Sequence, residues 1–161
     1  MIQIYTDGGC SGNPGPGGWA YIIIRNERLG MRNEGENNRE PVPITENWGA
    51  ERSTTNNRME LMAVIAALET LARTGPPDEK VAVITDSQYV QKGMTLWVHD
   101  WKKKGWKTSG KEPVKNQDLW QRLDTLASGF SIDWVWVKGH AGDKFNEYCD
   151  DLTQKAIASN R

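Results

Sequence analysis

Four acidic residues occupy positions that leave little freedom for a side chain. Asp7 ends an apolar N-terminal strand pattern, Asp86 ends a short β-branched run, and Glu60 and Asp150 fall within two helical patterns. In an α/β sheet, neighbouring strands end side by side, and a helix packed on the sheet can direct a carboxylate toward the same point. Carboxylates at such short distances repel one another, so a cluster of them implies hard divalent cations. Oxygen ligands without Cys or imidazole favour Mg²⁺ or Mn²⁺ over Zn²⁺.

Each acid also has a simpler explanation when taken alone. Asp86 precedes Ser87 and could open a short helix, while Glu60 and Asp150 could face solvent. Only the four positions together favour a metal site over these alternatives.

A histidine adds a second chemical group to this set. His140 lies in Gly139-His140-Ala141-Gly142, directly after an apolar strand pattern. In a loop there, its imidazole could carry a proton to or from a nearby water. The other histidine, His99, offers no ligand spacing with it, so a zinc site is not expected.

Charge and tryptophan gather in residues 97–115, which we name the basic segment. Residues 101–115 contain six lysines and one acid, Glu112, and therefore carry a local charge of +5. Four of the eight tryptophans lie in or beside this stretch: Trp97, Trp101, Trp106 and Trp120. Aromatic faces interleaved with ammonium groups suit a sugar-phosphate backbone. Alternatively, the rings pack a helical pair and the lysines solvate it, and both can hold together.

The composition limits the classes of protein to consider. A length of 161 residues favours one domain, and no apolar run approaches the roughly 18 residues of a membrane span. The net charge of −1 means that any polyanion site must be local. Cys10 and Cys149 are far apart and are expected to be reduced thiols. No secretory signal pattern is visible, so we expect a cytoplasmic protein.

Hydrophobic periodicity predicts the elements that must position these groups. Strands are expected at residues 1–5, 19–24, 81–85 and 132–137, and helices at 55–74, 87–92, 96–104, 118–127 and 146–159. Thr54 or Thr55 can cap the first helix. Glycine and proline in residues 8–18 predict an elaborate hairpin loop, and the polar residues 30–50 leave room for one further strand at most. This order predicts a mixed α/β sheet flanked by helices.

The glycines of the predicted hairpin loop formally satisfy a relaxed dinucleotide-binding pattern, Gly15-x-Gly17-x-x-Ala20. Such a turn must open into a helix whose N-terminus faces the pyrophosphate. Residues 19–24 form a β-type run instead, so we interpret these glycines as part of a strand connection.

Four motifs carry a resemblance to a known family. They are Tyr5-Thr6-Asp7-Gly8, Thr54-Thr55-Asn56-Asn57-Arg58-Met59-Glu60-Leu61-Met62, Thr85-Asp86-Ser87-Gln88-Tyr89-Val90 and Trp136-Val137-Lys138-Gly139-His140-Ala141-Gly142. With them, the chain resembles bacterial type 1 ribonuclease H over nearly its whole length, apart from residues 30–50. The resemblance implies a ribonuclease H-like α/β fold, a mixed five-stranded sheet flanked by helices on both faces. It implies one catalytic domain over residues 1–161, with a polar insertion near 30–50 and the basic segment as a protrusion.

The resemblance also implies an activity. It is endonucleolytic hydrolysis of the RNA strand of RNA/DNA hybrids with two Mg²⁺ ions, or Mn²⁺ as a substitute, leaving 5′-phosphate and 3′-hydroxyl ends with little base-sequence specificity. Asp7, Glu60, Asp86 and Asp150 would bind the metal, and His140 would assist proton transfer or product release. The partner would be the hybrid, with no membrane, no obligate protein partner and a monomeric state.

The resemblance assigns hybrid binding to a further set of residues. Cys10, Asn13, Asn56, Asn57 and Gln88 would line the minor groove, and Thr55 would contact a DNA phosphate. The basic segment would grip the DNA strand through Trp97, Trp101, Lys103, Trp106, Lys107 and Lys115. Two positions depart from the family pattern for the DNA-phosphate pocket, because Ser53 stands where Arg is frequent and Asp100 where Asn is common.

Two other functions compete with hydrolysis of hybrid RNA. A binding module for hybrids or double-stranded RNA that has lost catalysis would need only the basic segment. A nuclease or integrase that acts on DNA strands could share the fold, because fold alone does not specify the reaction. Intact carboxylates argue against the first, and the motif around Glu60 argues against the second.

Overall fold

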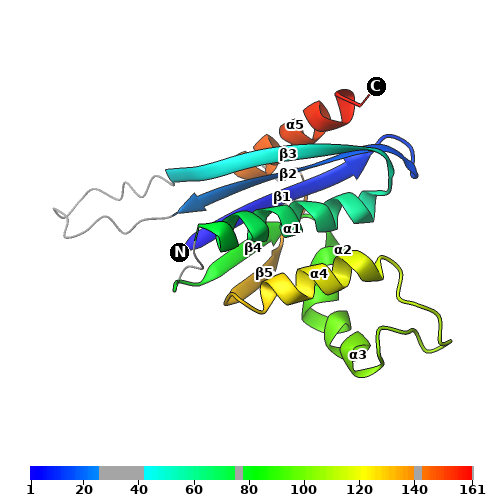
Figure 1. Ribbon diagram of the computed structural model, residues 1–161. Helices are drawn as coiled ribbons and strands as arrows, with labels where there is room; N and C mark the ends of the chain where they lie inside the picture. The colour runs from blue at the N-terminus through cyan, green and yellow to red at the C-terminus, as the bar shows by residue number, and fades with distance from the viewer. Residues whose placement is uncertain (26–41, 75–77, 140–142, 161) are drawn as a thin grey trace.

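The computed structural model describes residues 1–25, 42–74, 78–139 and 143–160. In this part of the chain, five strands form one mixed sheet in the order β3-β2-β1-β4-β5 (Figure 1). The strands are β1 Ile2–Cys10, β2 Gly15–Arg25, β3 Val42–Thr54, β4 Val81–Thr85 and β5 Ile132–Trp136. β1, β2 and β3 are antiparallel neighbours, while β4 runs parallel to β1 and β5 parallel to β4.

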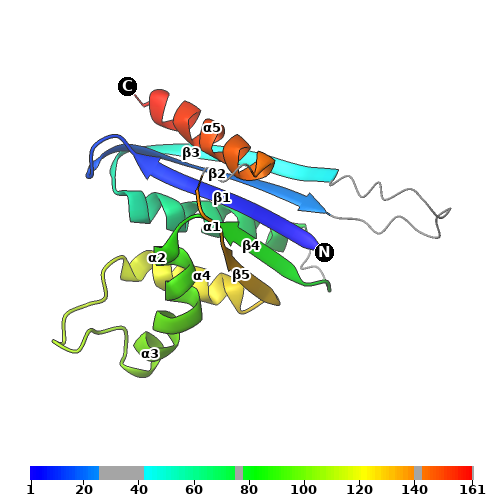
Figure 2. The same ribbon diagram turned by 180° about the vertical axis from the view of Figure 1, so that it is seen from behind.

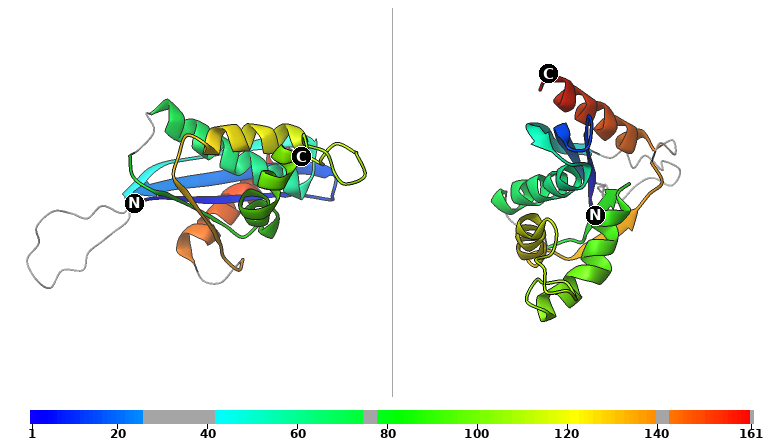
Figure 3. Two further views of the ribbon diagram at one scale, coloured as in Figure 1. Left: turned by 90° about the horizontal axis from the view of Figure 1, so that it is seen from below. Right: turned by 90° about the vertical axis from the view of Figure 1, so that its right-hand side faces the viewer.

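Helices cover both faces of the sheet, as the resemblance implied. α1 Asn56–Arg73 and α4 Gln117–Ala127 lie on one face, and α5 Lys144–Ala158 crosses the other (Figures 2 and 3). α2 Gln88–Lys92, η1 Gly93–Trp97 and α3 Val98–Lys103 form one bent helical segment that projects beyond the sheet (Figure 1). No helix of the described chain is both long and apolar enough to cross a membrane.

The two-residue period of the strands divides the core between these faces. Ile2, Ile4 and Ile23 pack with α1 and α4, whereas Ile22 and Ile24 pack on the α5 side. β4 is buried at all five positions, as expected for a central parallel strand. In the sheet, β1 and β4 are each paired with a neighbouring strand on both sides.

Hydroxyl side chains begin two helices, and one of them is Thr55, a predicted cap of α1. Thr55 Oγ1 accepts a hydrogen bond from the Arg58 N–H at 3.3 Å, which satisfies an amide of the first turn of α1. Ser87 Oγ accepts from the Val90 N–H at 3.1 Å and caps α2 in the same way. The helices expected at 87–92 and 96–104 are not separate, because the π-helical turn η1 joins them.

The prediction of a long glycine-rich loop at residues 8–18 is wrong. β1 continues to Cys10 and β2 starts at Gly15, with Gly8 paired to Trp19 and Gly9 to Gly18. These glycines serve close packing, because a Cβ on Gly8 would lie 2.3 Å from the Met59 carbonyl carbon. A Cβ on Gly18 would lie 2.6 Å from the Ala156 Cβ. Glycine therefore lets α1 and α5 approach the sheet from opposite sides.

At most one further strand was expected in the polar residues 30–50. The described part of this stretch has one strand, β3, and it is longer than the composition of these residues suggested. β3 pairs with β2 from Val42 to Thr54, and residues 26–41 lie outside the described part of the chain. β3 is an edge strand, so Glu46 and Trp48 can stay exposed while the backbone pairs on one side. Exposure explains why the stretch looked like a loop.

Gly93 provides a test of packing at the start of η1. A Cβ built on Gly93 would lie 1.9 Å from Cη2 of Trp120, a side chain with 0% exposure. We expect Gly93→Ala to lower the free energy of unfolding by about 1–3 kcal/mol, because the buried indole must shift. Urea unfolding followed by tryptophan fluorescence would measure this. Gly110→Ala is the control, since the nearest atom to its Cβ is 3.9 Å away; equal losses for both variants would contradict the packing argument.

Candidate active site

Three of the four predicted acids converge at one point of the sheet. Asp7 belongs to β1, Asp86 directly follows β4, and Glu60 lies in the second turn of α1. β1 and β4 are parallel and pair Thr6 with Thr85, so the next residue of each strand is an acid. Each of the three carboxylates offers an oxygen within 4.8 Å of the other two.

Gly8 makes this convergence possible. A Cβ at Gly8 would lie 2.5 Å from the Glu60 backbone nitrogen, so only glycine lets this turn of α1 contact β1. The backbone of Gly8 also hydrogen-bonds the carboxylates of Asp7 and Glu60, which favours their charged forms. Gly8 was predicted as part of a hairpin loop and of the motif that contains Asp7, and nothing local to it pointed to contact with Glu60.

Burial and mutual repulsion perturb the acids strongly. Asp7 is 6% exposed and Glu60 is 9% exposed. Burial, followed by the charge of Asp86, raises the pKa of Asp7 to about 7. Burial, followed by the charge of Asp7, raises the pKa of Glu60 well above its usual range. Both shifts disfavour the fully charged cluster in the absence of a cation.

The residues fit a divalent metal ion. All the converging ligand atoms are carboxylate oxygens, which hard cations prefer. Glu60 Oε2 is buried and has no hydrogen-bond partner among the described residues. A buried oxygen of this kind needs a partner, and a cation between the three acids would provide one.

Asp150 lies close to the cluster but not within it. Its charge contributes to the raised pKa values of both Asp7 and Glu60, yet its carboxylate is not among the three that share the 4.8 Å limit. One turn further along α5, the buried Thr153 hydrogen-bonds Asp7 with its side chain, which lowers the pKa of that acid. Thr153 was missed in the sequence, where its only signal is a spacing of three residues from Asp150 on one helix face.

The end of β5 approaches the cluster beside Asp86. Trp136 Nε1 donates to the Asp86 carbonyl oxygen at 3.0 Å, and the Val137 N–H donates to the Thr85 carbonyl at 2.9 Å. A Cβ on Gly139 would lie 3.2 Å from Asp86 Oδ2. The next residue, His140, lies outside the described part of the chain.

The predicted groove-lining residues form a polar patch at the β1–β2 turn and the start of α1. Asn56 Oδ1 accepts from the Cys10 N–H at 2.8 Å, and Asn13 Oδ1 accepts from the Asn56 N–H at 3.3 Å. Asn57 and Gln88 are exposed at the first turns of α1 and α2. Three distant segments thus present amide and thiol groups on the surface.

The tryptophans of the basic segment pack against one another. Trp101 lies 5.9 Å from Trp97, 6.3 Å from Trp106 and 5.4 Å from Trp120, measured between ring centroids. The six lysines of residues 101–115 are exposed, and Lys103 and Lys107 form no ion pair with a described residue. The structure therefore confirms that the rings pack while the ammonium groups stay in water, and binding of a sugar-phosphate backbone by this segment stays a prediction.

Comparison with known proteins agrees with this geometry. The family model for RNase H matches residues 1–158. The chain is 52% identical over 160 residues to the ribonuclease H of Maricaulis maris, covering 99% of this chain and 95% of that protein. It is 50% identical over 155 residues to that of Treponema pallidum, covering 96% and 89%. This chain belongs to the RNase H family.

Solved structures of RNase H proteins share the fold. LC9-RNase H1, described as a type 1 RNase H with the type 2 active-site motif, superposes with a TM-score of 0.81 at 36% identity, over 99% of this chain and 73% of that one. LC11-RNase H1, solved in complex with an RNA/DNA hybrid, gives 0.70 at 26% identity, over 99% and 98%. The mixed sheet with helices on both faces is therefore an RNase H fold.

The two departures from the RNase H family pattern lie on the surface. Ser53 is exposed in β3. Asp100 is exposed in α3 and lines a hollow of about 230 Å³ together with Trp97, Trp101, Lys104, Lys107, Thr108 and Ser109. Two lysines therefore share the hollow with this acid and offset its charge.

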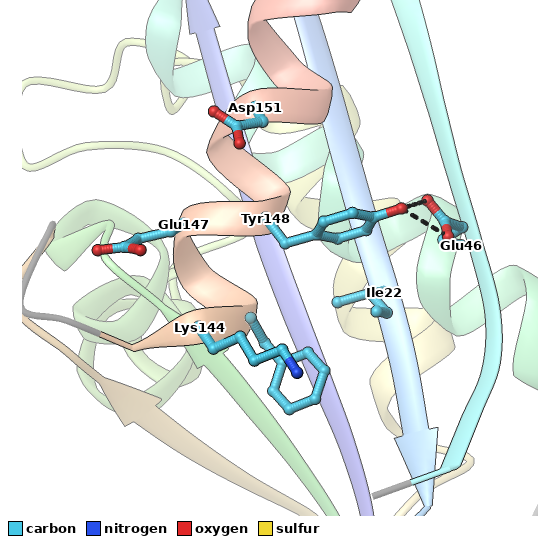
Figure 4. Close-up of a pocket in the computed structure, with 7 residues that line it drawn as sticks. Ile22, Glu46, Lys144, Glu147, Tyr148 and Asp151 are labelled. Carbon is cyan, nitrogen blue, oxygen red and sulfur yellow. Dashed lines mark hydrogen bonds between the residues drawn. The ribbon is translucent and has the colours of Figure 1, made fainter.

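A separate hollow of about 380 Å³ lies between α5 and the strands β2 and β3 (Figure 4). Tyr148 reaches across it from α5 and donates to both carboxylate oxygens of Glu46 in β3, at 2.8 and 2.7 Å. This bond fastens the edge strand to the helix. The hollow contains none of the predicted site residues.

The perturbed pKa of Asp7 leads to a pH-dependent prediction for the metal-free protein. The folded state keeps its proton on Asp7 up to a pH of about 7, whereas the unfolded chain releases it near pH 4. Wild-type stability should therefore fall as the pH rises from 4 to 7, and Asp7→Asn should be more stable above pH 7 by about 2–4 kcal/mol. Below pH 4 the two should be equal.

Thermal unfolding in chelator, measured across this pH range, would test this prediction. Asp151→Asn on the exposed side of α5 controls for the substitution itself. Added divalent cation should stabilise wild type at pH 8 more than Asp7→Asn, because the ion binds the folded state. An Asp7→Asn variant that is less stable than wild type at pH 8 in chelator would contradict the repulsion between these acids.

Proposed function

We propose that this chain is an endonuclease that hydrolyses the RNA strand of RNA/DNA hybrids, leaving 5′-phosphate and 3′-hydroxyl ends. The observation that carries the proposal is the convergence of Asp86 with the buried Asp7 and Glu60 in an RNase H fold. A hybrid is bound by the related LC11-RNase H1. A binding module without catalysis would have no need for such a costly cluster.

Asp7, Glu60, Asp86 and Asp150 hold the divalent cations in this proposal. The family uses divalent metal ions, and we assign two Mg²⁺ ions, with Mn²⁺ as a substitute, because the donor set is all carboxylate oxygen. When bound, these cations neutralise charge on the reacting phosphate and lower the pKa of the attacking water. The Gly8 backbone and Thr153 orient the carboxylates, and His140 assists proton transfer or product release.

The surface residues account for substrate choice. Cys10, Asn13, Asn56, Asn57 and Gln88 present amide and thiol groups that suit RNA 2′-hydroxyls and base edges in a minor groove. Thr55 contacts a DNA phosphate. The basic segment contacts the DNA strand through Trp97, Trp101, Lys103, Trp106, Lys107 and Lys115. Contacts to backbone and groove edges carry little sequence information, so we infer little base-sequence specificity.

The organisation of the protein follows from the same proposal. Residues 1–161 act as one catalytic domain, with a polar insertion near 30–50 and the basic segment as a protrusion. We infer that the protein works as a monomer in the cytoplasm, without an obligate protein partner.

Cleavage of end-labelled substrates tests the activity. Wild type should cut the RNA of an RNA/DNA hybrid with Mg²⁺ or Mn²⁺, and chelator should abolish the cuts. Asp7→Asn should lower turnover by at least about a thousandfold, because it removes a charged metal ligand at the reacting phosphate. RNA duplex, DNA duplex and single-stranded RNA serve as matched substrates.

Each alternative function has a distinct outcome in this experiment. Binding of hybrid without any cut, under either ion, would establish the binding module in place of the enzyme. Cuts in the DNA strand would identify a related DNA nuclease. Full hybrid cleavage by Asp7→Asn would refute the role of the cluster.

The salt dependence of binding tests the basic segment. Each lysine that neutralises a phosphate releases counterions, so hybrid affinity should fall steeply as salt rises. Replacing both Lys103 and Lys107 with Ala should reduce the slope of log K against log salt by about two. Fluorescence anisotropy with labelled hybrid and inactive Asp7→Asn protein would measure it. Lys80→Ala with Lys155→Ala removes the same charge elsewhere and should leave the slope unchanged; a slope equally insensitive to both pairs would mean that Lys103 and Lys107 do not contact phosphate.

A further inference from the structure

Arg58 joins the catalytic helix to the start of α4. It lies in α1, two residues before Glu60, and its guanidinium donates to both carboxylate oxygens of Asp118, at 3.0 and 2.8 Å. The same group donates to Asn116 Oδ1 at 3.3 Å. This two-pronged contact has a fixed geometry that a single ammonium group cannot reproduce.

Asn116 extends this contact toward α2. It is the N-cap residue of α4 and has left-handed backbone angles, φ 61° and ψ 28°. Its Nδ2 donates to the Tyr89 hydroxyl at 3.1 Å, and the indole Nε1 of Trp120 donates to the same oxygen at 3.0 Å. Side-chain bonds on both sides of Asn116 thus hold a backbone conformation that non-glycine residues rarely adopt.

The basic segment is attached to this network. Trp120 is fully buried and contacts Tyr89 at 5.1 Å and Trp101 at 5.4 Å between ring centroids. The Trp106 N–H donates to the Trp101 carbonyl, and the Val114 N–H donates to the Trp106 carbonyl. The exposed lysines extend from this framework, and the hydrogen bonds of Arg58 to Asn116 and Asp118 connect it to α1 near Glu60.

We propose that Arg58 is a positioning residue: through Asn116 and Tyr89 it sets where the basic segment stands relative to the catalytic carboxylates. The inference rests on the proposed function and adds to it a residue that touches neither the metal nor the hybrid. Arg58 lets Lys103 and Lys107 meet DNA phosphates while Asp7, Glu60 and Asp86 meet the RNA.

A second arginine provides a matched control. Arg122 Nη2 donates to Glu69 Oε1, which also connects α4 to α1, but the pair lies far along both helices from the carboxylates. Its side chains are 47% and 34% exposed, against 33% and 65% for Arg58 and Asp118. Both pairs therefore hold the same two helices together, and only the Arg58 pair reaches Asn116 and Tyr89.

A double-mutant cycle on hybrid cleavage tests the proposal. Arg58→Lys keeps the charge but loses the two-pronged contact, and should raise KM for hybrid roughly tenfold with little change in kcat. In the background of Lys103→Ala with Lys107→Ala, the same substitution should raise KM by less than about twofold, because the displaced lysines are already absent. Arg122→Lys should leave KM unchanged in both backgrounds. Urea unfolding of each variant separates lost stability from lost positioning.

Asn116→Gly is a second variant that keeps the left-handed backbone while it removes both side-chain bonds. It should reproduce the KM effect and its dependence on the two lysines. Equal KM effects of Arg58→Lys in both backgrounds, a fall in kcat alone, or no effect of Arg58→Lys and Asn116→Gly would overturn the positioning role. Failure of wild type to cut any hybrid would instead refute the proposed function, and this inference with it.

Discussion

The mutual repulsion of three carboxylates, two of them buried, is the constraint on which the rest of the structure depends. Asp7, Glu60 and Asp86 cannot all be charged at close range without a strong opposing force. The fold supplies it by anchoring each acid in a separate rigid element: a central strand, the end of its parallel neighbour, and a helix that Gly8 admits against the sheet. The repulsion between these acids therefore lowers the stability of the metal-free fold, and binding of a divalent cation offsets that loss of stability.

The same scaffold separates chemistry from recognition. The carboxylates lie within β1, directly after β4 and in α1, the polar patch lies on the β1–β2 turn and the start of α1, and the lysines lie on a segment beyond the sheet (Figure 1). The groups differ in exposure, because Asp7 and Glu60 are buried while the lysines are in water. Buried aromatic rings and the Arg58 contacts provide the rigid connection between the regions.

Much of the fold could be predicted because its signals are local. The apolar period of α1, the Thr55 cap and the buried run of β4 each appear within a few residues of sequence. The glycines of β1 and β2 misled the prediction, because a glycine needed for close helix packing looks the same as one needed for a turn. β3 was underestimated for a related reason, since an edge strand exposed to water has the composition of a loop.

The sequence by itself determined the chemistry available: which acids, amides and lysines exist, and which strand or helix carries each. Hydrophobic periodicity and capping act over short distances, so these assignments needed no knowledge of the fold. Only the tertiary structure decided that Asp7, Glu60 and Asp86 meet while Asp150 stays outside their closest group, and that Thr153 and Arg58 support the site. Such contacts depend on strand order and on how closely helices pack against the sheet, and both are set by the chain as a whole.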